Sequence, residues 1–268
     1  MGKIFTVWSV DGGTGKTTLS SNIALRTALK YPEKKVLMID FNLTNADISS
    51  MMSLETNDLQ KLYENIVRQG VEFNIIEQQV TYHPKVRNLG VIGGVTDIHY
   101  VDKFTLDMFN EVLRHIKEMD FDFIFIDING TLNIDATFAS LINADRTIIM
   151  AECLYSSIRN MIVYRKDALS KIDITDENSY IVINKYNPSL INVSELEKIL
   201  NTDDFYCIDL NLSIMQSVNE GNPFVLEKSR NRDLKRVMET IDALIERLNG
   251  VVEEDNKQEI STEENKEV

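Results

Sequence analysis

The sequence predicts an α/β fold in which a mostly parallel, doubly wound sheet is flanked by helices. Two observations predict it. Short apolar runs alternate with segments of helical periodicity along the chain, which is typical of βα units on a parallel sheet. One run, F-D-F-I-F-I-D-I at 121–128, is so apolar that it fits only a central strand buried on both faces.

The first half of the chain supplies several of these elements, each for a local reason. An apolar run at 4–10 enters a Gly-rich turn, and a helical pattern follows at 16–30. V-L-M-I-D at 36–40 predicts a second strand that ends on an acidic residue. The remaining elements are a weakly periodic helical stretch at 57–79, a short strand at 88–92 that stops at a Gly-Gly pair, and an amphipathic helix at 106–119.

The second half continues the alternation beyond the central strand. Further strands are predicted at 146–150, 180–184 and 205–208. Helices are predicted at 158–169, 194–200 and 233–248. We expect one domain at 1–249, because 268 residues with 43% hydrophobic content can bury one substantial core. The acidic stretch at 250–268 is predicted to be a disordered tail.

The overall charge restricts the partners. The formal net charge is -14, and such a field repels nucleic acid and anionic lipid unless a local basic patch offsets it. No charged-then-apolar leader and no membrane-spanning run are visible, so we expect a cytoplasmic protein without a membrane helix. Cys153 and Cys207 lack metal-ligand spacing and are expected to be buried free thiols.

The segment S-V-D-G-G-T-G-K-T-T at 9–18 carries the strongest chemical signal. A Gly-rich turn between a strand and a helix N-terminus aims backbone N–H groups and the helix dipole at an anion. Glycines at the turn let the backbone close around phosphate oxygens, Lys16 adds a positive charge, and the Thr17 hydroxyl can ligate Mg²⁺. The predicted nucleotide-binding residues of the loop are Gly12, Gly13, Thr14, Gly15, Lys16, Thr17 and Thr18. The usual first glycine of such a loop is replaced by Val10.

Two aspartates close predicted strands. Asp40 ends V-L-M-I-D, and Asp127 ends F-I-F-I-D. Ligands of doubly wound sheets bind at the carboxyl ends of the strands, so both carboxylates can face the loop and hold Mg²⁺ through its water shell. For each of them the alternative is a strand-end residue that caps the following helix.

Four segments carry a family resemblance: G-G-T-G-K-T-T, V-L-M-I-D-F-N-L-T-N-A-D-I, F-D-F-I-F-I-D-I-N-G and V-I-N-K-Y-N-P. In order and spacing they resemble the ParA/MinD family of P-loop ATPases, which have a deviant Walker A loop. The resemblance continues through S-S-I-R-N at 156–160 and S-V-N-E-G-N-P-F at 217–224, and it covers residues 3–248. It looks closest to the MinD branch, including pilus-localisation relatives of the CpaE/TadZ type.

The resemblance implies more than the residues alone predict. It implies a three-layer P-loop NTPase fold, binding of Mg-ATP with Asn184 against the adenine, and an ATP-dependent face-to-face homodimer. It also implies that Lys16, Asp40, Asn42 and Asp127 form the catalytic set, with Thr17 and Asp127 at the metal. The cycle of such a dimer places another protein machine in the cell, such as a pilus, flagellar, secretion or division apparatus.

The chain departs from the family pattern at two site positions. The family loop begins with a lysine that reaches the partner's phosphates, and here that position is Asp11. The family also has a second acidic residue after the second strand to orient the attacking water, and here it is Asn42, which cannot accept a proton. We therefore expect ATP binding with weak hydrolysis at most.

Alternative functions remain open on the sequence. A nucleotide-independent scaffold is one, because the catalytic residues are altered. A DNA-associated, ParA-type segregation ATPase is another, for which the basic residues would be Lys228, Arg230, Arg232, Lys235 and Arg236. The negative net charge of the chain favours the interpretation of that cluster as a solvated helix face with ordinary ion pairs.

Overall fold

The computed structural model describes residues 1–95, 97–100, 102–226 and 232–264. Within these residues, eight strands form one sheet in the order β3-β4-β2-β5-β1-β6-β7-β8. All neighbouring pairs in it are parallel except β3 with β4, which is antiparallel. The predicted fold class, a mostly parallel sheet flanked by helices, is confirmed.

The strands have the following bounds: β1 Lys3–Trp8, β2 Val36–Phe41, β3 Thr81–His83, β4 Val86–Ile92, β5 Phe123–Ile128, β6 Arg146–Glu152, β7 Ser179–Tyr186 and β8 Phe205–Asp209. The α-helices are α1 Lys16–Lys30, α2 Ile48–Met51, α3 Leu59–Gln69, α4 Phe73–Glu77, α5 Leu106–Glu118, α6 Asp135–Asn143, α7 Tyr155–Asp167, α8 Val193–Leu200, α9 Leu212–Asn219 and α10 Arg232–Glu264. Short 3-10 turns lie at Ile98–Tyr100, Leu169–Ile172 and Phe224–Leu226.

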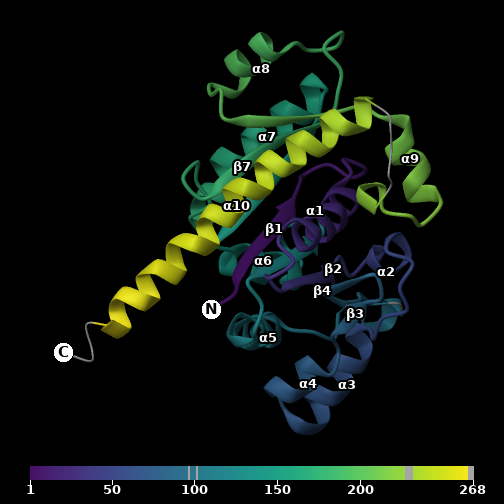
Figure 1. The fold of residues 1–268 in the computed structure, drawn as a ribbon, viewed down its shortest axis with the longest axis vertical. Helices are drawn as coiled ribbons and strands as arrows, with labels where there is room; N and C mark the ends of the chain where they lie inside the picture. The colour runs from purple at the N-terminus through teal and green to yellow at the C-terminus, as the bar shows by residue number, and fades with distance from the viewer. Residues whose placement is uncertain (96, 101, 227–231, 265–268) are drawn as a thin grey trace.

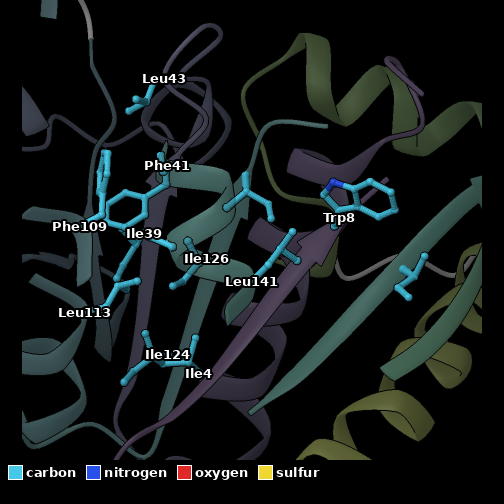
Figure 2. Close-up of a cluster of buried hydrophobic side chains, with 14 of the residues drawn as sticks. Ile4, Trp8, Ile39, Phe41, Leu43, Phe109, Leu113, Ile124, Ile126 and Leu141 are labelled. Atoms are coloured by element: carbon cyan, nitrogen blue, oxygen red, sulfur yellow. The ribbon is translucent and has the colours of Figure 1, made fainter. Parts of the chain in front are cut away.

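Two hydrophobic cores lie on opposite faces of the sheet, because successive side chains of a strand point to opposite faces. Alternate residues of β1, β2 and β5 pack against α3 to α8 in one core, and the intervening residues pack against α1, α2 and α10 in the other. Figure 2 shows part of the first core, where Phe41 of β2 meets Phe109 of α5 with ring centroids 5.1 Å apart. Helices therefore cover both faces, as the nearly continuous apolar strands predict.

The long helix α10 lies across the sheet and runs past its edge to Glu264 (Figure 1). Residues 250–264, which the sequence predicts to be a disordered tail, continue the helix in the structure. Val252 is buried in the core beneath α10, so the packed part of the helix passes the predicted boundary, and Glu, Lys and Gln propagate a helix once it is started. Residues 265–268 of the predicted tail lie outside the described residues.

Four elements have no counterpart among the predictions, and one of them is the four-residue helix α2. The edge strand β3 is only three residues long, and α6 and α9 follow β5 and β8 on segments without clear apolar periodicity. The predicted helix at 57–79 is two helices, α3 and α4, because Gly70 ends α3 with a φ of 85°. The two cysteines are free as predicted, with Cys153 buried and Cys207 half-buried.

Candidate nucleotide site

The turn between β1 and α1 has the backbone shape that its glycines predict. Gly13 and Gly15 have φ values of 73° and 91°, in the left-handed region that favours glycine, and Gly15 is the N-cap of α1. A Cβ on Gly15 would lie 2.6 Å from Asn184 Nδ2. A Cβ on Gly12 would meet nothing within 4 Å, so the structure itself requires glycine at 13 and 15 but not at 12.

Ser9 organises the interior of this turn. Its hydroxyl donates to the carbonyl of Asp11 at 2.8 Å and therefore accepts from Thr14 Oγ1, 2.7 Å away. It also accepts from Lys16 Nζ at 2.9 Å. Its place three residues before Gly12 was the only sequence signal for this role, and we did not predict it.

Lys16 is the cation of the turn. Burial lowers the pKa of Lys16, while the nearby carboxylates of Asp127 and Asp11 act in the opposite direction. The ammonium also donates to the carbonyl of Asp11 at 3.4 Å. A partly desolvated cation at the N-terminus of α1 attracts an anion more strongly than an exposed lysine would.

Asp127 lies at the carboxyl end of the central strand β5, on the face covered by α1. Its carboxylate accepts from Thr17 Oγ1 at 2.6 Å and from Ser20 Oγ at 3.1 Å. Burial raises the pKa of Asp127 to about 6, although these two hydrogen bonds and Lys16 act against the shift. Thr17 and Asp127, both predicted to lie at the metal, are therefore hydrogen-bonded to each other.

Asp40 is the register partner of Asp127 across β2 and β5, but its carboxylate has other partners. One oxygen accepts from the N–H of Asn42 and the other from the N–H of Ile48, both at 3.1 Å. The side chain is fully buried and does not line the cavity, and burial raises the pKa of Asp40 well above its usual range. Asp40 therefore caps the segment between β2 and α2, which is the alternative that the sequence left open.

The Asp11 side chain lies at the larger cavity, and α7 fixes the direction of its carboxylate. The carboxylate accepts a hydrogen bond from Asn160 Nδ2 of α7 at 3.1 Å. A carboxylate about 4 Å from a phosphate oxygen would cost on the order of 4 kcal/mol at an effective dielectric near 20, and the bond to Asn160 holds it in place. Asn160 belongs to the S-S-I-R-N segment, but its contact with Asp11 is visible only in three dimensions.

The glycine turn joins two adjoining cavities. The larger, about 470 Å³, is lined mainly by polar groups of the turn and by Asn42, Asn45, Asp47 and Asn129. The smaller, about 230 Å³, is lined by Asn184, by Lys185 and by apolar side chains of α9, namely Ile214, Met215 and Val218. Gly13, Gly15 and Thr18 line both. One elongated ligand, polyanionic at one end and flat and apolar at the other, would occupy both cavities.

Asn184 lies at the boundary between these cavities, near the end of β7. Its Nδ2 donates to the carbonyl of Thr14 at 2.7 Å. The next residue, Lys185, donates to the carbonyl of Gly13 at 2.8 Å and pairs with Glu152. Lys185 and α9 are parts of the site that we did not predict.

The oxygen ligands near Lys16 suit Mg²⁺ held mainly by water and phosphate. No group of three or more His, Cys, Asp or Glu side chains in the described part of the chain could hold a metal. Mg²⁺ commonly binds through one or two protein oxygens together with substrate phosphates, and the Thr17 hydroxyl backed by Asp127 provides such a position. The fit is therefore that of a metal that arrives with a nucleotide.

Comparisons with known proteins identify the family of the chain. A family model described as an AAA domain matches residues 2–165. The septum site-determining protein MinD of Escherichia coli K12 is 26% identical over 270 residues, covering 96% of this chain and 97% of its own. The chain belongs to the ParA/MinD family of P-loop ATPases.

Solved structures of ParA/MinD proteins share the fold. MinD from Pyrococcus horikoshii OT3, complexed with Mg-ADP, has a TM-score of 0.76 at 21% identity and covers 94% of this chain and 99% of its own. A putative plasmid partition protein from Borrelia burgdorferi B31, bound to AMPPNP, has a TM-score of 0.66 at 19% identity. The match covers 92% of this chain and 100% of the partition protein. Among the described residues of this ParA/MinD member, no helix is long and apolar enough to cross a membrane.

Proposed function

We propose that the protein is an ATP-binding positioning switch: it binds Mg-ATP in the double cavity, hydrolyses it slowly, and uses the bound state to place a protein machine. The observation that carries this proposal is the pair of cavities joined by Gly13, Gly15 and Thr18. The polar cavity beside Lys16 suits the phosphates, and the apolar one beside Asn184 suits the adenine. Relatives named for septum placement and for plasmid partition support positioning as the shared role.

Slow hydrolysis is proposed from the two altered positions. In this reading Lys16 and the turn bind the phosphates, Thr17 and Asp127 hold Mg²⁺, and Asp40 holds the segment that carries Asn42. A cation supplied in trans contributes roughly 10³ to 10⁵ in rate in related phosphoryl transfers, and Asp11 cannot supply it. Asn42 lines the cavity where the family's water-orienting carboxylate would be, and it cannot accept a proton.

We further propose that the switch is a homodimer formed through the edge of the sheet that carries the site. Large apolar side chains are exposed in the segments that follow β6, β7 and β8 at this edge: Leu154, Tyr155, Leu190, Val193, Leu210, Leu212 and Met215. Leu212 has an exposed fraction of 77%. Exposed apolar residues gathered near a ligand cleft favour an interface that closes over the ligand.

A DNA-associated role has less support. Arg236 lies 3.8 Å from Asp209 and Lys235 lies 3.7 Å from Glu239, which is the ion pairing of a solvated helix face. Lys228 and Arg230 of the same predicted cluster lie outside the described residues. We therefore propose a protein machine as the cargo, in the class of pilus, flagellar, secretion or division apparatus.

The experiment that tests the proposal is calorimetric titration of the protein with Mg-ATP, with Lys16→Ala as the paired variant. We expect saturable binding by the natural protein and at least a tenfold weaker affinity for the variant, because one charge-assisted contact to phosphate is lost. Lys61→Ala, on the surface of α3, is the matched control and should bind normally. Absence of binding by the natural protein would leave the nucleotide-independent scaffold as the better account.

A further inference from the structure

Asn129, Thr44 and Asn42 are connected by hydrogen bonds, and the two asparagines line the larger cavity. This network begins after β5, where the backbone N–H of Thr131 donates to Asn129 Oδ1 at 2.9 Å. A backbone N–H can only donate, so the Asn129 oxygen must face it and the Asn129 nitrogen must face the other way. That nitrogen, Nδ2, lies 2.7 Å from Thr44 Oγ1 and 3.4 Å from Asn42 Oδ1.

The orientation of Asn129 determines the orientation of Asn42. The Asn42 oxygen accepts from Asn129 Nδ2 and also from Thr44 Oγ1, 3.3 Å away. Turning the Asn42 amide over would place its own nitrogen against the nitrogen of Asn129, two donors facing each other. Asn42 Nδ2 donates to none of the residues that the structure describes, although Asn42 is 91% buried and lines the cavity. The cavity therefore receives an N–H donor from Asn42 and no acceptor.

The position of this donor indicates its ligand. Asn42 and Asn129 belong to the larger, polar cavity, and Asn184 belongs to the smaller one on the other side of the glycine turn. A nucleotide with its base in the smaller cavity would extend its terminal phosphate toward Asn42. An N–H donor is complementary to a phosphate oxygen, whereas a carboxylate at the same place would repel it.

We propose that Asn129 is a positioning residue that fixes Asn42 as a donor to the terminal phosphate, so that the cleft prefers a nucleoside triphosphate to the diphosphate. This inference rests on the proposed nucleotide binding, and it adds a preference for the triphosphate over the diphosphate. The same arrangement slows hydrolysis of ATP. The Asn42 oxygen is occupied by Asn129 and Thr44, so it cannot orient an attacking water.

The test is a pair of calorimetric titrations with Mg²⁺ present, using ADP and the non-hydrolysable analogue adenylyl imidodiphosphate. The natural protein should bind the analogue at least about tenfold more tightly than ADP, the contribution of one hydrogen bond to a charged group. Asn129→Leu, of similar size but without donor or acceptor, should remove most of that ratio and leave the affinity for ADP unchanged. Asn129→Asp, whose inner oxygen would turn the Asn42 nitrogen away from the cavity, should remove it as well.

Asn45→Leu is the matched control, because Asn45 lines the same cavity and its side chain makes no hydrogen bond with the described residues. Asn45→Leu should keep the natural ratio between the affinities for the analogue and for ADP. A variant that only folds less well would lower both affinities together, so that its ratio would also stay unchanged. Equal affinities in the natural protein, or an unchanged ratio in both Asn129 variants, would overturn the inference and leave nucleotide binding standing. Failure of the natural protein to bind either nucleotide would overturn both.

Discussion

The Asn160 side chain donates a hydrogen bond to the Asp11 carboxylate at 3.1 Å, and this contact connects α7 to the mouth of the phosphate turn. Asp11 carries a negative charge close to Lys16, and the hydrogen bond fixes the direction of its carboxylate. In the proposed function Lys16 and the glycine turn bind the phosphates, and Asp11 cannot supply a cation to a partner subunit. The following predictions test this division.

Replacing Asp11 with lysine should restore the missing cation. We expect Asp11→Lys to hydrolyse ATP at least tenfold faster than the natural protein in single-turnover assays, where the full effect of a cation in trans would be about 10³ to 10⁵. Asp11→Asn is the matched control: it removes the charge and keeps an acceptor for Asn160, so it should bind ATP more tightly without a gain in rate. Equal rates in all three proteins would show that Asp11 does not limit hydrolysis.

Releasing Asp11 should weaken ATP binding. In Asn160→Leu the carboxylate loses its donor and can approach the phosphates, so we expect the affinity for Mg-ATP to fall by roughly three- to tenfold. The same substitution made in Asp11→Asn should have little effect, because no charge remains to be released. A double-mutant cycle by calorimetry measures the coupling, and additive effects of the two changes would contradict it.

The two glycines with positive φ should differ from Gly12 in their effect on stability. Gly15→Ala adds a Cβ 2.6 Å from Asn184 Nδ2 at a φ of 91°, so we expect a loss of about 1–3 kcal/mol in the free energy of unfolding. Gly12→Ala meets no atom within 4 Å and should change it by less than about 0.5 kcal/mol. Chemical denaturation of the nucleotide-free proteins compares the two, and equal losses would contradict the assignment.

Asp145 should stabilise the fold in a pH-dependent way. Burial alone raises the pKa of Asp145, but the N–H of Ile4 at 2.9 Å and the ammonium groups of Lys117 and Lys3 outweigh it, so the pKa lies below its usual value. A group whose pKa is lower in the folded state stabilises the protein above its unfolded pKa of about 3.9 and loses this effect as the pH falls through the folded value.

We therefore expect Asp145→Asn to lower the free energy of unfolding by about 1–3 kcal/mol at pH 7, and by progressively less below about pH 4. Urea denaturation at several pH values measures the difference between the two proteins. Asp120→Asn, at a side chain that is 90% exposed, is the control and should have little effect at any pH. If Asp145→Asn lowers the free energy of unfolding by the same amount down to pH 3, the effect comes from packing and not from charge.

Much of the site follows from the sequence because strand parity and strand ends are local properties. Asp40 follows Val36 and Met38 at even spacing and Asp127 follows Phe123 and Phe125, so both aspartates fall on the face covered by α1. The glycine turn and the start of α1 at Lys16 were predicted for the same kind of reason. Their positions needed no knowledge of the tertiary structure.

The unpredicted parts depend on contacts between segments far apart in the chain. The bond between Asn160 and Asp11 joins residues 149 positions apart, and the contact of Asn129 with Asn42 joins residues 87 apart. Whether the Asp40 carboxylate faces a metal or the N–H of Ile48 depends on how the loop after β2 closes, which the pattern does not encode. α9 was missed because its apolar residues line the cavity instead of following a regular core stripe.

In the proposed switch, ATP bound beside Lys16 changes how copies of this chain associate. The most direct test is the molar mass in solution by light scattering, with Mg-ATP, with Mg-ADP and without nucleotide, alongside Leu212→Glu at the exposed apolar edge. We expect the mass to double with Mg-ATP only, and Leu212→Glu to remain a monomer while still binding nucleotide. A mass that is the same under all three conditions, with ATP shown to be bound, would contradict the account.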